Sequence, residues 1–133
     1  SLTEEAKHSI NILLAEDNLV NQKLARYMLT KAGYQVEVAN NGQETVEKFT
    51  KEPERFSLIF MDVNMPEMDG REATRVLRNR GYKDIPIIAL TADAMKEDRD
   101  KCLEAGMNDY LAKPIRREHV YNMVRKWIFE REG

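Results

Sequence analysis

The chain has 133 residues, a length that favours a single domain with a substantial core. Charged residues make up 33% and hydrophobic residues 42% of it, and the net charge of −2 gives no reason to expect a nucleic-acid groove or contact with a membrane surface. The longest apolar runs are too short to span a bilayer, and the N-terminus lacks the basic-then-apolar plan of a signal peptide. A single cysteine, Cys102, excludes an internal disulfide framework and fits a reducing compartment, so we expect a cytoplasmic domain, whether or not its parent protein is membrane-anchored.

Five predicted strands alternate strictly with five predicted helices along the chain. Residues 1–9 are polar and lack a period, so we interpret them as a linker remnant before a domain that covers residues 10–131. Apolar runs predict strands at residues 10–15, 34–39, 57–62, 86–90 and 109–112. Helical spacing and turn signals predict helices at residues 18–31, 43–51, 69–81, 93–105 and 116–130. Crossovers of this length are right-handed and place helices on both faces, which predicts an α/β three-layer sandwich around a parallel five-stranded sheet.

Two of the predicted helices carry apolar stripes that we expect to face the core. In the helix at residues 18–31 the stripe comprises Val20, Leu24, Met28 and Leu29. In the helix at residues 116–130 the stripe comprises Val120, Met123, Val124, Trp127 and Ile128. The helix at residues 69–81 is predicted to begin at Asp69, its N-cap, with Glu72 as the capping-box partner.

Acidic, hydroxyl and basic side chains follow the carboxyl ends of four predicted strands. They are Glu16 and Asp17 after the first strand, and then Asp62, Thr91 and Lys113. Function gathers at this edge of an open parallel sheet, where the strand order reverses. Crowded carboxylates repel one another and are usually stable only with a cation, and Mg²⁺ prefers hard oxygen ligands. The pattern therefore predicts a site for a divalent metal and a phosphoryl group.

Each of these residues also has a simpler interpretation when it is taken alone. An acid after a strand can cap the next helix or stabilise a turn, a threonine can end a strand, and a lysine can be a solvated surface residue. Capping explains neither Glu16 nor Asp62, so the cluster favours the site. A carboxylate can attack phosphorus and form an aspartyl phosphate, with Lys113 and the Thr91 hydroxyl covering phosphoryl oxygens.

Four short motifs resemble the receiver domains of two-component response regulators. They are AEDN at residues 15–18, MDVNMPEMDG at 61–70, ALTA at 89–92 and YLAKP at 110–114. The resemblance covers about residues 10–129, and the segments after the acid pair and after Thr91 look most like receivers attached to hybrid sensor histidine kinases. It implies a flavodoxin-like (βα)5 fold with strand order 2-1-3-4-5.

The resemblance also implies a role for each site residue. Asp62 would accept a phosphoryl group from the phosphohistidine of a histidine kinase or a histidine phosphotransfer domain. Asp17 would bind Mg²⁺ directly, Glu16 would act mainly through water, and the backbone carbonyl of Asn64 would be a further ligand. The domain would catalyse its own phosphorylation and dephosphorylation without turning over a separate substrate.

A conformational switch is part of the same implication. Thr91 would be the switch hydroxyl, Tyr110 the switch aromatic and Lys113 the phosphate-binding lysine, followed by a cis bond to Pro114. Phosphorylation would draw Thr91 inward and let the Tyr110 ring turn, so the surface would change and a phosphorylation-dependent dimer could form.

Two further expectations concern the donor and the competing function. Leu19 and Ile115 lie on the rim of strand ends and are expected to form an exposed docking patch, whereas Val20 is assigned to the core stripe. The alternative function is a Mg²⁺-dependent phosphatase of haloacid-dehalogenase type, which also uses a strand-end aspartate. That family places a second acid two residues after the nucleophile, where this chain has Asn64. A scaffold without phosphotransfer would lack a site residue, and none is missing here.

Overall fold

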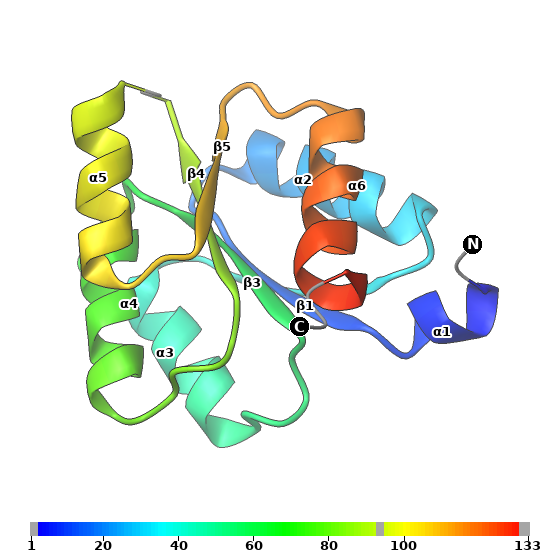
Figure 1. Ribbon diagram of the computed structural model, residues 1–133, viewed down its shortest axis with the longest axis horizontal. Coiled ribbons are helices and arrows are strands. Elements are labelled where there is room, and N and C mark those ends of the chain that lie inside the picture. The colour runs from blue at the N-terminus through cyan, green and yellow to red at the C-terminus, as the bar shows by residue number, and fades with distance from the viewer. Residues whose placement is uncertain (1–2, 93–94, 131–133) are drawn as a thin grey trace.

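The computed structural model describes residues 3–92 and 95–130, and a five-stranded parallel sheet forms its centre (Figure 1). The strands are β1 (Asn11–Ala15), β2 (Gln35–Ala39), β3 (Leu58–Asp62), β4 (Ile87–Thr91) and β5 (Asp109–Ala112). Their order is β2-β1-β3-β4-β5, and every neighbouring pair is parallel. The predicted α/β fold and strand order are therefore confirmed.

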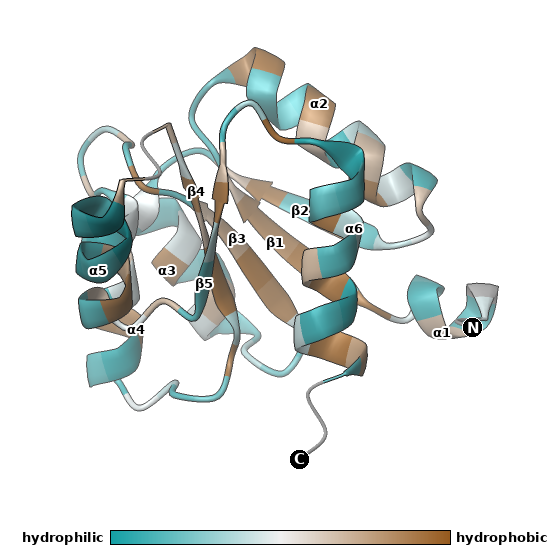
Figure 2. Ribbon diagram, turned by 45° about the horizontal axis from the view of Figure 1, so that its top comes forward, coloured by the Kyte–Doolittle hydropathy of each residue, from teal (hydrophilic) through white to brown (hydrophobic). Residues whose placement is uncertain are grey.

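Helices cover both faces of the sheet. They are α2 (Leu19–Lys31), α3 (Gly42–Lys51), α4 (Gly70–Asn79), α5 (Lys96–Ala105) and α6 (Arg117–Val124). The short helix α1 (Glu4–His8) comes before β1 and stands apart from the sheet (Figure 1). One core cluster joins the sheet to α3, α4 and α5, and a second joins it to α2 and α6. Figure 2 shows the apolar central strands between helices in which polar and apolar residues alternate. The strands β3 and β4 are buried along their whole length, as expected of parallel strands covered on both sides.

The chain differs from its sequence prediction near both ends. The segment interpreted as a linker remnant contains the short helix α1, in which the side chain of Thr3 caps the first turn by accepting from the Ala6 N–H. The predicted last helix changes at Arg125 into a π-helical turn, η1 (Arg125–Phe129). The helix α5 begins at Lys96, and the earlier predicted start falls on residues 93–94, outside the described part of the chain. Among the described residues, no helix has the length and apolar character needed to cross a bilayer.

The predicted core stripe of α2 is wrong at two positions. Val20 is 73% exposed and Leu24 is 42% exposed, while Leu29 lies in the core. The buried face is formed by Gln22, Ala25 and Leu29. Gln22 can be buried because its amide nitrogen donates to the backbone carbonyl of Glu16 and to Oδ1 of Asn40, so this donor is satisfied. The stripe of the last helix does face the core, with Val120 and Val124 buried and its other three members packed against the same cluster.

Close packing brings the start of α4 against the end of β3. Asp69 caps α4 as predicted, with its Oδ1 accepting from the Glu72 N–H at 2.8 Å. A Cβ atom added to Gly70 would lie 2.2 Å from the backbone oxygen of Asp62. Only glycine permits this approach, so the sequence of the turn fixes the helix directly beside the last residue of the strand.

Candidate metal and phosphoryl site

Three carboxylates converge at the carboxyl edge of the sheet. Glu16 and Asp17 follow β1, Asp62 ends β3, and these two strands are neighbours. One carboxylate oxygen from each residue lies within 4.8 Å of the others. Glu16 is 1% exposed and Asp62 is buried, whereas Asp17 is exposed to solvent. The structure thus brings together the acids that the sequence pattern predicts to meet.

Lys113 reaches into this cluster from the end of β5. Its Nζ lies 2.8 Å from Oδ2 of Asp62 and 3.0 Å from Oε1 of Glu16. Burial alone would lower the pKa of Lys113, but hydrogen bonds and charges from Asp62 and Glu16 outweigh burial and raise it. Lys113 is therefore a fixed cation, held at the point where a phosphoryl oxygen would need neutralisation.

Glu16 is the most enclosed of the three acids. Its Oε2 accepts a hydrogen bond from the Asn18 N–H at 3.1 Å, and its Oε1 pairs with Lys113. Burial raises the pKa of Glu16 because it disfavours the charged form, and the neighbouring Asp62 raises it further because a second negative charge beside the first is unfavourable. A single lysine beside three carboxylates leaves an excess of negative charge, and a hard divalent cation fits this donor set.

The backbone after Asp62 also contributes to the site. The Asn64 N–H donates to Oδ1 of Asp62 at 3.1 Å, so each carboxylate oxygen of Asp62 already has a defined partner. Asn64 itself is exposed in the loop between β3 and α4. The role of its carbonyl as a metal ligand stays a prediction.

Thr91 and Tyr110 lie on β4 and β5, the two strands that follow β3 on the side away from β1. Thr91 is buried at the end of β4, the strand that pairs with β3. Tyr110 is half-buried in β5 and packs against the core cluster under α5. The Lys113–Pro114 bond is cis, as expected, and the Lys113 N–H donates to the Thr91 carbonyl at 2.8 Å.

Arg99 is a residue that the sequence analysis missed. It lies on α5, and its Nη1 donates a hydrogen bond of 2.6 Å to the Tyr110 hydroxyl. An arginine in a highly polar helix carries no sequence signal of such a contact, because only the folded packing of α5 on β5 brings the two residues together. Asn18 was also given no role in the site from the sequence, but its side chain caps α2 and its N–H donates to Oε2 of Glu16.

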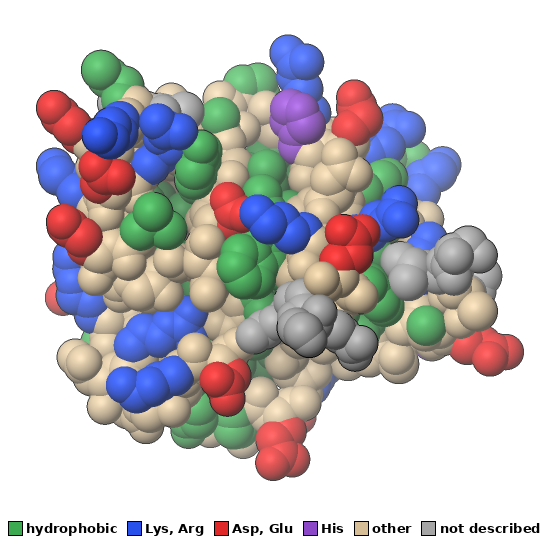
Figure 3. Space-filling model, viewed as in Figure 1, with side chains coloured by type: hydrophobic (Ala, Val, Ile, Leu, Met, Phe, Trp, Pro, Cys, Tyr) green, Lys and Arg blue, Asp and Glu red, His purple; other side chains and the backbone are tan. Residues whose placement is uncertain are grey.

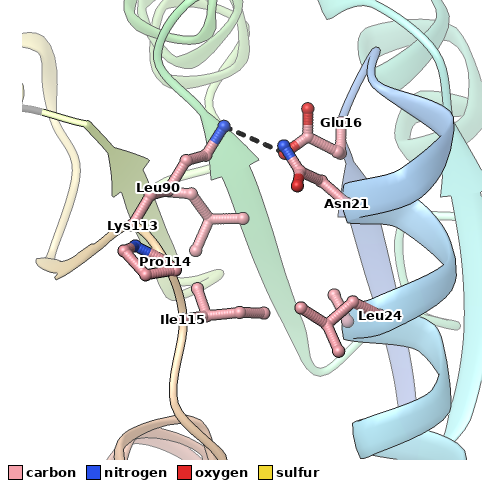
Figure 4. A pocket seen from close by; sticks show the side chains of 8 residues that line it. Glu16, Asn21, Leu24, Leu90, Lys113, Pro114 and Ile115 are labelled. Carbon is pink, nitrogen blue, oxygen red and sulfur yellow. Dashed lines mark ion pairs between the residues drawn. The ribbon is translucent and has the colours of Figure 1, made fainter.

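An apolar pocket of about 280 Å³ opens beside the charged cluster. Glu16 and Lys113 form one end, and Leu24 of α2 and Ile115 face each other across it (Figure 4). Leu19 and Val20 are exposed at the start of α2, the helix that also supplies Leu24 to the pocket. Ile115 is half-buried, so the expectation that Val20 would be more buried than Ile115 is wrong. Ile115 packs on the core between α2 and α6, whereas Val20 points to solvent.

Comparison with known proteins identifies the relatives of this chain. The family described as response regulator receiver domain matches residues 12–125. Hybrid signal transduction histidine kinase M of Dictyostelium discoideum is 41% identical over 125 residues, which cover 91% of this chain and 5% of that protein. The chain also spans only 14% of the histidine kinase BarA of Escherichia coli. These curated relatives are therefore far longer than the chain.

Solved structures give the same answer for the fold. The receiver domain of the sensor histidine kinase PA1611 from Pseudomonas aeruginosa, solved with magnesium in its active-site cleft, is 43% identical with a TM-score of 0.83 and covers 90% of this chain and 98% of that one. The receiver domain of Ssk1 from Saccharomyces cerevisiae, solved with the phosphotransfer protein Ypd1, is 32% identical with a TM-score of 0.84 and covers 90% of this chain and 89% of that one. The haloacid-dehalogenase alternative is not supported by these matches.

Proposed function

The chain belongs to the family of response regulator receiver domains of two-component systems, and we propose that Asp62 is the residue that accepts its phosphoryl group. The observation that carries this assignment is the placement of Asp62 at the end of the central strand β3, between the acid pair and Lys113. No other carboxylate among the described residues ends a strand in contact with the fixed cation and within reach of two further acids.

The reaction needs little more from the protein than positioning and charge. An oxygen of the Asp62 carboxylate forms a bond to phosphorus while the bond from phosphorus to the donor histidine nitrogen breaks. The leaving imidazole keeps that electron pair and departs neutral, because its other ring nitrogen carries a proton. Lys113 holds positive charge against the transferred oxygens, and Asn64 orients the attacking carboxylate through its N–H.

The donor set of Glu16, Asp17 and Asp62 suits Mg²⁺, the ion present in the PA1611 receiver domain. We propose Asp17 as a direct ligand, since its exposed carboxylate makes no hydrogen bond or ion pair with any described residue. Both oxygens of Glu16 are already engaged, so it acts mainly through water. When bound, the metal supplies positive charge that offsets the charge of the phosphoryl oxygens.

The phosphoryl donor is proposed to be a helical histidine kinase or phosphotransfer domain that docks on α2. The Ssk1 receiver domain was solved together with the histidine phosphotransfer protein Ypd1, which supports this class of partner. Apolar side chains on the outer face of α2, Leu19, Val20, Leu24 and Tyr27, are exposed and lead to the pocket lined by Ile115. A helix laid along this stripe would carry its phosphohistidine toward Asp62.

We also propose a parent protein and a cellular location for this domain. Similarity to hybrid kinases suggests that the domain forms one part of such a kinase, in which it relays phosphoryl groups between histidine-bearing domains. A cytoplasmic location agrees with the free thiol of Cys102, which would suit a reducing compartment.

Intact mass measurement tests the assignment. The protein is incubated with Mg²⁺ and acetyl phosphate, and Asp62→Asn is expected to lose the added phosphoryl mass that the wild type gains. Asp69→Asn is a matched control, because it makes the same chemical change at the end of the loop that follows Asp62, and asparagine still caps α4. If Asp62→Asn gains an acid-labile phosphoryl group at the wild-type rate, the assignment is wrong.

A further inference from the structure

Arg99 holds the side chain of Tyr110 through two contacts. Its Nη1 donates a hydrogen bond of 2.6 Å to the Tyr110 hydroxyl. Its guanidinium carbon also lies 5.3 Å from the centre of the Tyr110 ring, within the range of a cation–π interaction. Both side chains are only partly exposed, so water competes weakly for these contacts. The orientation of the ring is therefore fixed both at its hydroxyl and over its face.

A second nitrogen of the Arg99 side chain has no hydrogen-bond partner among the described residues. This nitrogen, the Nε, is buried. A buried donor without an acceptor disfavours the packing that contains it. The packing seen here thus combines a strong charged hydrogen bond with an unmet donor, and a different packing of α5 on β5 could compete with it.

We propose that Arg99 is a positioning residue that holds Tyr110 in the packing of the unphosphorylated domain. This inference rests on the proposed function, in which phosphorylation of Asp62 shifts the domain to a second packing. Lys113 Nζ contacts Oδ2 of Asp62 directly in the packing described here, and we assign this packing to the unphosphorylated domain. Turning the Tyr110 ring breaks its bond to Arg99, so the bond stabilises the first packing alone. Its loss raises the population of the second packing and, by linkage, the affinity for a phosphoryl group.

Beryllofluoride, a non-covalent phosphoryl analogue, provides the test in the presence of Mg²⁺, with its affinity measured by calorimetry. Arg99→Met keeps an unbranched apolar stem and removes the guanidinium, and we expect about tenfold tighter binding, the factor that a charged hydrogen bond contributes to an equilibrium. The control must show the effect of losing one positive charge from α5, a helix over which Figure 3 shows basic and acidic side chains interspersed. Lys101→Met removes a charge from an exposed position of the same helix and is expected to leave the affinity unchanged.

A double-mutant cycle separates positioning from a structural role. Tyr110→Phe removes the hydrogen-bond acceptor and keeps the ring, so it is also expected to tighten binding. Arg99→Met is then expected to add less in the Tyr110→Phe background than it does alone. If Arg99→Met lowers the thermal unfolding midpoint, the affinity of Tyr110→Phe for beryllofluoride becomes the decisive measurement, because this variant removes the acceptor of the same hydrogen bond and leaves Arg99 in place.

The outcomes distinguish the inference from the function on which it rests. Unchanged or weaker binding by Arg99→Met and Tyr110→Phe, or full additivity of the two, overturns the role of Arg99 while the proposed function stands. Failure of the wild type to bind the analogue, or equal binding by Asp62→Asn, overturns the proposed function and the inference together.

Discussion

Replacement of Lys113 by methionine tests how the site is balanced electrically. The substitution keeps an unbranched side chain but removes the cation that lies within 3.0 Å of both Glu16 and Asp62. Removal of one partner from a buried ion pair typically destabilises a protein by about 3–5 kcal/mol. Because 22% of the Lys113 side chain is exposed, water can partly replace it, and we expect a loss at or just below the lower end of this range, about 2–3 kcal/mol.

The loss is expected to depend on Mg²⁺. Without Lys113 the three carboxylates have no fixed cation, so Lys113→Met is expected to bind Mg²⁺ more tightly than the wild type does. Metal that binds only the folded state raises its stability by linkage. The destabilisation measured with a chelator is therefore expected to shrink markedly when Mg²⁺ is present in excess.

Urea unfolding followed by the fluorescence of Trp127 measures both effects. With a slope of about 2 kcal/mol per molar urea, the expected loss moves the midpoint down by roughly 1–1.5 M in the presence of a chelator. Lys101→Met, at an exposed position, is the control and is expected to move it little. Equal destabilisation of Lys113→Met with and without Mg²⁺ would show that Lys113 does not compete with a metal for these carboxylates.

Three further predictions concern the metal, the donor and pH. Glu16→Gln is expected to weaken Mg²⁺ binding about tenfold in calorimetry, as is typical of a residue that acts on the metal through water. Asp17→Asn is expected to weaken it more. A wild-type Mg²⁺ affinity in Asp17→Asn would show that Asp17 is not a direct ligand. Val20→Glu, at an exposed position, is expected to slow transfer from a phosphohistidine protein about tenfold and to leave acetyl phosphate labelling intact. Equal slowing with both donors would place docking elsewhere. Burial would raise the pKa of Asp109, but its hydrogen bonds to Lys126 and Trp127 outweigh burial and lower it below 3.8. The ionised Asp109 carboxylate therefore stabilises the fold above about pH 4, and this stabilisation is lost as pH falls through the lowered pKa. The difference in unfolding free energy between wild type and Asp109→Asn is expected to shrink below about pH 4. A difference that stays constant with pH in urea unfolding would contradict this.

The strands and the acid cluster follow from local sequence rules. A continuous apolar run is typical of a parallel strand that helices bury on both faces, so a charged residue directly after the run marks the end of that strand. Glu16 and Asp62 were therefore predictable as neighbours once adjacent strands were expected, and the structure places them together.

The outer face of α2 was harder to predict. Apolar residues at helical spacing indicate an apolar face, but the spacing does not say whether that face meets the core or a partner. Val20 and Leu24 are exposed because the small Ala25 and the satisfied amide of Gln22 occupy the side that packs on the sheet. Arg99 was missed for a similar reason, since its contact depends on the packing of α5 against β5.

The contact of Lys113 with Glu16 joins the last strand end of the domain to the first. During synthesis, the ribosome delivers both acidic strand ends well before Lys113 emerges. Until β5 pairs with β4, the carboxylates lack their cation and the cleft lacks one wall. The cluster of acids and lysine is therefore assembled only when the whole sheet has formed, so the same pairing of β5 with β4 that completes the sheet also completes the site.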